Sequence, residues 1–294
     1  MDISLLLAQF MSGLARGTML FLVASGLSLI FGVMNILNFA HASLWLMGAY
    51  FCHTFWLMME NYGFGLWVSI PLAALTLAGI GWLIEVVLIR RVYNRELPEQ
   101  LLLTYAMVLI IGDLLKLFWG VEDRIITRPA LVQRPVFIFG NPFDSYFIFV
   151  ILIGAAIAVG LWWFMQKTRY GHIVRAAVFS REMVGALGIP IPRIYTGVFV
   201  LGIFIAGLAG AVQAPVGSIT LGMDMGVIVQ AFCVVVIGGF GSLPGTLVGS
   251  LIVGEIYSFA ILFWPAGALV MIFVVTALVL ITRPWGLFGT PMRI

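Results

Sequence analysis

The stretch GLSLIFGVMNILNFAHASLWLMGAY, from Gly26 to Tyr50, decides how this chain folds. It lies in a long apolar region, yet four hydrogen-bonding side chains stand near its centre, namely Asn35, Asn38, His41 and Ser43. Such side chains are costly in hydrocarbon unless they face protein or water. The stretch therefore predicts a broken or re-entrant segment near residues 33–43, with its polar groups turned inward.

The composition of the whole chain predicts a membrane protein. Of its 294 residues, 63% are apolar and only 9% are charged, and the mean hydropathy is +1.15. Soluble domains carry about 25% charged residues. Apolar runs long enough to cross about 30 Å of hydrocarbon recur from end to end. We expect an all-α polytopic membrane protein, because the short alternating segments of a β-barrel are not seen.

The apolar runs predict about eight to nine transmembrane helices in a single membrane domain that covers residues 1–294. No linker or low-complexity segment interrupts the chain. The candidate spans are residues 6–31, 42–59, 65–89, 100–119, 145–166, 193–214, 225–240, 246–264 and 266–282.

Lysine and arginine are concentrated in the 90–99 loop, the 167–193 loop and the C-terminal tail. Nine crossings place these three segments on one side, which the positive-inside rule makes the cytoplasm, with the N-terminus outside. The 120–143 loop, which also carries arginines, then lies outside. Because the formal net charge of +3 resides in loops rather than in a patch, we expect no nucleic-acid partner.

A second break occurs in VVVIGGFGSLPGTLVGS, from Val234 to Ser250, where glycines and a proline interrupt an apolar region near residues 238–245. Two separated breaks indicate a translocation site, because freed backbone groups and helix ends line such sites. A glycine-rich hinge without a path is the alternative. The candidate path residues are Asn35, Asn38, His41, Ser43, Gly239, Gly241, Ser242 and Glu255.

Two charged residues within apolar runs stand out. Glu255 lies in mid-span without a local cation, and the sequence leaves open whether it makes a buried hydrogen bond or belongs to the pathway. Arg16 either pairs with Asp2 or Asp224 near the outer surface, which we favour, or meets an anionic substrate.

No catalytic or metal-binding pattern is present in the sequence. The three histidines, His41, His53 and His172, have no metal-ligand spacing, and no Gly-x-Ser-x-Gly or phosphate-binding loop occurs. We therefore expect no enzyme activity, no metal and no cofactor. If transport is driven by ATP, another polypeptide must hydrolyse it.

The segment KTRYGHIVRAAVFSREMVGALGIPIPR, from Lys167 to Arg193, is the longest polar loop. We expect one short helix over residues 175–187, ended by Gly188 and Pro190. Its expected docking face consists of Ala176, Ala177, Val184 and Leu187. Such a helix suits insertion into a partner's groove, and a merely solvated loop is the alternative.

Together these stretches resemble the permease subunits of bacterial ABC importers for branched-chain and other hydrophobic amino acids. The resemblance is carried by Asn38-Phe39-Ala40-His41 with Gly48-Ala49-Tyr50, Arg175-Ala176 with Glu182 and Ala186-Leu187-Gly188-Ile189, Ala206-Gly207-Leu208-Ala209-Gly210, and Gly238-Gly239-Phe240-Gly241-Ser242. Ala42, where the family commonly has glycine, and Arg16, in a stretch usually uncharged, depart from the pattern.

The resemblance implies a subunit of the bacterial cytoplasmic membrane that forms a heterodimer with a second homologous permease. It also implies two ATP-hydrolysing subunits and an extracytoplasmic solute-binding protein. Residues 175–189 would be the coupling helix, with the coupling residues Arg175, Ala176, Glu182, Ala186, Leu187 and Gly188.

The residues near both breaks offer hydrogen bonds and apolar contact but no charge cluster, which predicts a small neutral or zwitterionic solute with an apolar body. Together with the resemblance, this favours a small hydrophobic amino acid as the cargo. Two other functions stay open. One is a passive channel or permease for urea, short amides or small organic acids. The other is an ion-coupled transporter, which the scarcity of acidic residues within the spans disfavours.

Overall fold

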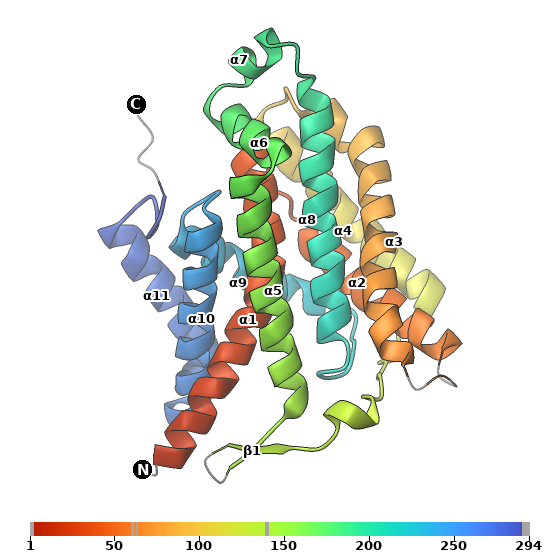
Figure 1. The fold of residues 1–294 in the computed structure, drawn as a ribbon, viewed down its shortest axis with the longest axis vertical. Helices are drawn as coiled ribbons and strands as arrows, with labels where there is room; N and C mark the ends of the chain where they lie inside the picture. Colours follow the sequence, from red (N-terminus) through yellow and green to blue (C-terminus); the bar gives the residue numbers. More distant parts are fainter. Residues whose placement is uncertain (1–2, 60–61, 63, 139–140, 290–294) are drawn as a thin grey trace.

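The computed structural model describes residues 3–59, 62, 64–138 and 141–289. These residues form a bundle of helices that run between two ends of the molecule (Figure 1). The α-helices are α1 (Ile3–Met34), α2 (His41–Met58), α3 (Gly65–Val87), α4 (Leu97–Trp119), α5 (Ser145–Lys167), α6 (Arg169–Phe179), α7 (Arg181–Ala186), α8 (Ile191–Gln213), α9 (Met223–Gly238), α10 (Leu243–Phe263) and α11 (Ala268–Thr282). Short 3-10 turns η1 (Ile89–Val92), η2 (Ala130–Val132) and η3 (Pro265–Gly267) and a hairpin of β1 (Val136–Ile138) and β2 (Asn141–Phe143) complete the described chain.

The predicted class, an all-α polytopic membrane protein, is confirmed. Seven helices of the described residues are long and apolar enough to cross a membrane, and these are α1, α3, α4, α5, α8, α10 and α11. The other two predicted spans are α2, with 18 residues, and α9, with 16. Each of the nine predicted spans therefore corresponds to one helix.

The basic segments gather at one end of the bundle. Figure 1 shows α6 and α7 near one end, and the start of α1 with β1 at the other. The loop after α3 also lies at the α6–α7 end, because Arg90 Nη2 donates to Thr196 Oγ1 near the start of α8 at 2.9 Å. Arg283 ends α11, whereas Arg293 lies outside the described residues. We call these the basic end and the N-terminal end.

A buried carboxylate ties α3 to α8 at the basic end. Glu85 is fully buried and forms an ion pair with Arg90 at 3.2 Å. It also accepts hydrogen bonds from Thr196 Oγ1 at 2.8 Å and from the Tyr93 hydroxyl. Burial and, after it, the bond to Glu85 raise the pKa of Tyr93. The hydroxyl therefore stays protonated and keeps donating to Glu85.

Glycine contacts bring α8 against its neighbours in the centre of the bundle. A Cβ atom at Gly26 in α1 would lie 2.5 Å from the Gly202 carbonyl oxygen, and one at Gly48 in α2 would lie 2.6 Å from that of Gly207. Apolar side chains gain little from leaving lipid for protein, so close backbone contact is what holds membrane helices together. These positions require glycine because no side-chain atom fits.

We predict that Gly48→Ala destabilises the protein and that Gly160→Ala does not. The added methyl group at Gly48 must push α2 away from backbone atoms of α8, at a cost of about 1–3 kcal/mol. Gly160 in α5 has no atom within 4 Å of its Cβ position among the described residues, so alanine there meets open space and favours the helix. Thermal unfolding of the detergent-solubilised variants measures the difference. Equal melting temperatures would contradict the role of the α2–α8 contact.

Candidate translocation site

The first break begins with a left-handed residue at the end of α1. Asn35 has φ 55°, the one positive φ among the described non-glycine residues, and its N–H donates to the Phe31 carbonyl at 2.8 Å. Asparagine tolerates this conformation and is a common substitute for glycine at helix ends. Asn35 is exposed, so its structural role is to terminate α1.

After Asn35 the chain returns into the bundle before α2 begins. His41, the first residue of α2, donates from Nε2 to the Val23 carbonyl of α1 at 3.0 Å. Val23 lies eleven residues before Met34, which is about 16 Å at the rise of an α-helix. The predicted re-entrant segment is therefore present, and the residues of α2 from His41 to Tyr50 are buried.

A hydrogen bond joins the first turns of α2 and α9. Ser43 Oγ donates to Asp224 Oδ2 at 2.5 Å, and both residues are buried. Asp224 occupies the first turn of α9, where a carboxylate is favoured by the partial positive charge of the helix terminus. The sequence places these residues 181 positions apart, so no local pattern predicted their contact.

Asn38 is the polar residue of the first break that the fold does not explain. Its side chain is fully buried, and neither Oδ1 nor Nδ2 has a hydrogen-bond partner in the described part of the chain. A buried polar group left unpaired costs about 1–3 kcal/mol, and such groups in native proteins require an explanation. Asn38 therefore remains the strongest candidate of the predicted set.

The second break is a glycine turn between α9 and α10. Gly239 and Gly241 have φ of 98° and 76°, and residues other than glycine rarely adopt these backbone angles. Ser242 caps α10 by accepting from the Gly245 N–H at 3.1 Å. The C-terminal segment also holds this turn, because the N–H groups of residues 287 and 288 donate to the carbonyls of residues 237 and 238 at 2.8 and 3.0 Å.

The structure brings the two breaks together and leaves Glu255 apart. The rings of Phe31 and Phe240 lie 4.5 Å apart between centroids, and a Cβ atom at Gly32 would lie 2.6 Å from Gly241 Cα. Glu255 instead packs against Gly13 in the N-terminal half of α1, and its two carboxylate oxygens have no hydrogen-bond partner among the described residues.

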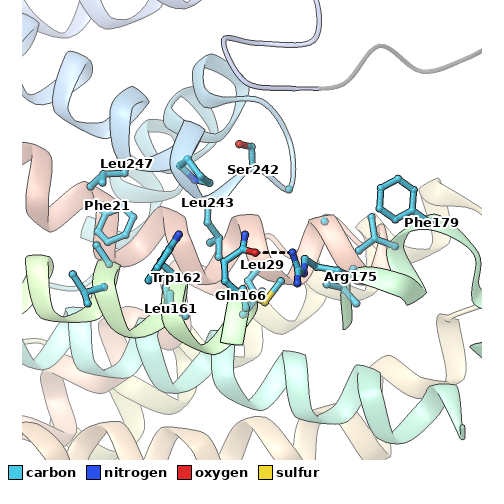
Figure 2. A pocket seen from close by; sticks show the side chains of 18 residues that line it. Phe21, Leu29, Leu161, Trp162, Gln166, Arg175, Phe179, Ser242, Leu243 and Leu247 are labelled. Carbon is cyan, nitrogen blue, oxygen red and sulfur yellow. Dashed lines mark hydrogen bonds between the residues drawn. The ribbon is translucent and has the colours of Figure 1, made fainter. Parts of the chain in front are cut away.

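A cavity of about 460 Å³ adjoins the second break, and we call it the inner cavity. Figure 2 shows Ser242 and Leu243 on one side of it and Arg175 of α6 on another, where Arg175 Nη1 donates to Gln166 Oε1 at 2.7 Å. Of the candidate path residues, Gly241 and Ser242 line this cavity. The inner cavity thus lies between the turn and α6.

A second cavity, of about 410 Å³, occupies the N-terminal half of the bundle, and we call it the outer cavity. Its polar lining residues are Gln9, Ser12, Arg16, Gln213, Gln230, Tyr257 and Ser258. The six candidate path residues other than Gly241 and Ser242 line neither cavity in the described structure. Sequence reasoning singled out Arg16 but missed the other members of this polar set, although three glutamines within apolar runs were the available signal.

The predicted helix over residues 175–187 is wrong in one respect, because Ser180 divides it into α6 and α7. Ser180 has extended backbone angles and caps α7 by accepting from the Met183 N–H at 3.2 Å. Serine competes for backbone groups in this way and favours helix starts. Gly188, with φ 79°, lies just after α7 in the left-handed conformation, as predicted for the residue that stops the helix.

The expected docking face of Ala176, Ala177, Val184 and Leu187 is divided, because two of its residues are buried and two are exposed. Ala177 and Val184 are buried against the bundle, whereas Leu187 is 75% exposed. Of the other residues predicted to couple to an ATPase, Arg175 is half-buried, and the exposed ones are Ala176, Glu182, Ala186 and Gly188.

Large apolar side chains stand out on the same loop. Phe179 is 92% exposed and Met183 is 67% exposed, and with Leu187 they recur every fourth residue. We call Phe179, Met183 and Leu187 the apolar tip. Figure 1 shows α7 beyond the ends of the membrane-spanning helices, so lipid does not account for this exposure.

The fold and these features define a multi-pass membrane protein with two helix breaks and an exposed coupling-like loop. The family described as branched-chain amino acid transport system / permease component matches residues 9–282. The chain therefore belongs to this family of permease components.

Individual relatives match over nearly the whole chain. The chain is 29% identical to the high-affinity branched-chain amino acid transport system permease protein BraD of Pseudomonas aeruginosa, over 97% of this chain and 96% of that one. It is 28% identical to the permease protein LivH of Escherichia coli strain K12, over the same shares. Among solved structures, PsaBC from Streptococcus pneumoniae in complex with Fab matches with a TM-score of 0.45 and 12% identity, over 90% of this chain and 87% of that one.

We predict that Asn38→Leu leaves stability nearly unchanged and that Ser43→Ala lowers it. Leucine has a similar branched shape and removes an amide that makes no hydrogen bond, so the free energy of unfolding should change by less than about 1 kcal/mol. Ser43→Ala leaves the buried carboxylate of Asp224 without its donor, which costs about 1–3 kcal/mol. Thermal unfolding in detergent compares the two. A loss with Asn38→Leu as large as that with Ser43→Ala would make Asn38 a structural residue.

Proposed function

We propose that this chain is the membrane-spanning subunit of an ATP-driven importer that moves a small hydrophobic amino acid into the cell. The observation that carries the proposal is the position of the apolar tip next to the second helix break. Phe179 of the tip and Ser242 of the second break line the same cavity. A partner that binds the tip can therefore act on the break through α6.

The proposed ATPase partners follow from two features of the chain, namely a sequence without a phosphate-binding loop and the exposed apolar tip. Its sequence has no phosphate-binding loop, so ATP hydrolysis is assigned to two separate ATPase subunits. The apolar tip and Glu182 offer one of them a surface on the basic end, which the positive-inside rule places in the cytoplasm. We further propose a second homologous permease, an extracytoplasmic solute-binding protein and a location in a bacterial cytoplasmic membrane.

The proposed cargo rests on the relatives and on the lining of the path. BraD and LivH are named as branched-chain amino acid permeases. In the first break, the buried amide of Asn38 has no hydrogen-bond partner among the described residues, whereas His41 and Ser43 already donate to Val23 and Asp224, and the inner cavity is lined mostly by apolar residues. This combination suits a zwitterion with an apolar body. Asn38 is assigned to the path, since an unpaired buried amide is available to a passing solute.

Uptake of labelled leucine into vesicles tests the function. Vesicles contain the chain with its second permease and ATPases, and the binding protein is supplied outside. We expect uptake that needs both ATP and the binding protein, competition by valine and phenylalanine, and a several-fold loss with Asn38→Leu. Leucine entry without ATP would indicate a channel. Competition by urea or benzoate alone would refute an amino-acid cargo.

We predict that replacing residues of the apolar tip with glutamine uncouples ATP hydrolysis from transport. The double variant Phe179→Gln, Leu187→Gln removes apolar side chains that are 92% and 75% exposed, so the fold should persist while binding of the ATPase subunit weakens at least about tenfold. Co-purification and ATP-dependent uptake measure the loss. Leu131→Gln, which changes an 82% exposed leucine in η2 at the N-terminal end, is the matched control. Undiminished coupling in the double variant would remove the tip from the interface.

A further inference from the structure

The outer cavity contains an arginine whose charge no described carboxylate balances. Arg16 Nη2 donates to Gln230 Oε1 at 3.2 Å, and its guanidinium carbon lies 3.5 Å above the centre of the Tyr257 ring. Its Nε has no hydrogen-bond partner among the described residues. A cation within a membrane-spanning helix is costly and marks a functional site by default.

Neither of the acidic residues on the helices around the cavity neutralises Arg16. Asp224, a partner predicted from the sequence, instead accepts the hydrogen bond from Ser43. Glu255 lies beside Gly13 and forms no ion pair in the described structure. Asp2, the other predicted partner, lies outside the described residues.

The position of Arg16 favours a solute over a lipid headgroup as its partner. The cavity runs along α1 from Gln9 to Val23, with Arg16 halfway between them. That length is about 21 Å at the rise of an α-helix. The lining includes residues where α8 and α10 end and α5 begins, and Val23 at the other limit is the residue that accepts the bond from His41. The cavity therefore extends between the ends of these helices and the start of α2.

Apolar side chains form another part of the cavity wall. They include Met19, Val23, Trp45, Phe147 and Val227, and a volume of about 410 Å³ is within the usual range of small-molecule sites. The guanidinium of Arg16 suits a carboxylate, because arginine forms strong charge-assisted hydrogen bonds with carboxylates. The apolar part of the lining suits an apolar body on the same molecule. The remaining polar residues, Gln213 among them, can orient the same group.

We propose that the outer cavity is a binding site for small carboxylates with an apolar body, and that Arg16 binds the carboxylate. This inference rests on the proposed function in taking leucine as the natural ligand. The site would receive the solute at the N-terminal end and hold it beside the start of α2. Specificity for the carboxylate would then reside in the permease itself.

The test measures ligand binding by the full-length chain in lipid nanodiscs, from the rise in melting temperature with ligand concentration. The probes are leucine, 4-methylpentanoate, which lacks the amino group, and leucinamide, which lacks the carboxylate. We expect leucine and 4-methylpentanoate to bind at least about tenfold more tightly than leucinamide, a ratio that corresponds to about 1.4 kcal/mol. Arg16→Gln should abolish this preference, and Arg16→Lys should restore part of it.

The matched control is Arg134→Gln, which removes one exposed arginine from the loop at the same end of the molecule and should behave as wild type. Equal binding of leucine and leucinamide by the wild type would overturn the site without any variant. So would an unchanged preference in Arg16→Gln, since Arg16 would then be solvated by water alone.

Failure of the site and failure of the proposed function give different results. Leucine uptake by the assembled transporter without any probe binding would remove the carboxylate site and leave the importer. Binding of 4-methylpentanoate that depends on Arg16, with neither leucine binding nor leucine uptake, would keep the site and refute the amino-acid cargo.

Discussion

The fold depends on enclosing the start of α2 in protein. Unpaired backbone and side-chain polar groups cost several kcal/mol in hydrocarbon, yet α2 begins about 16 Å back along α1, with His41 and Ser43 in its first turn. The enclosure is possible because α8 approaches α1 and α2 at glycines, where backbone atoms are in contact. A Cβ atom at Gly26 of α1 or Gly48 of α2 would overlap a backbone oxygen of α8, so a larger residue at either position would push α8 away.

The sequence was sufficient to predict the features that are local in the chain. Apolar length gave nine spans, and Asn35, Gly239 and Gly241 marked turns because their backbone conformations exclude most other residues. Helix ends and spans are set by neighbouring residues, so they can be recognised in one chain. The division of the coupling segment at Ser180 was also local, and the serine was a signal that the prediction of one helix overlooked.

Contacts between distant segments could not be predicted. The hydrogen bond between Ser43 and Asp224 forms because α2 packs against α8 and α9 packs against α1, which brings the two residues together. No rule based on sequence spacing predicts a contact across 181 residues. The outer cavity is likewise formed by residues from several helices, so Arg16 could be noticed in the sequence but not given its neighbours Gln230 and Tyr257. The burial of Ala177 and Val184, two residues of the expected docking face, has the same cause, because only tertiary packing decides which face of a short helix is buried.

The C-terminal segment that covers the second break has a consequence for the order of synthesis. The carbonyl of Ile237 accepts its hydrogen bond from Leu287, which is translated fifty residues later. Until Leu287 has been translated, the turn between α9 and α10 therefore lacks the backbone N–H groups that donate to its carbonyls. The segment after α11 completes this turn, so a polypeptide that stopped before Leu287 would leave carbonyls beside the inner cavity without these donors.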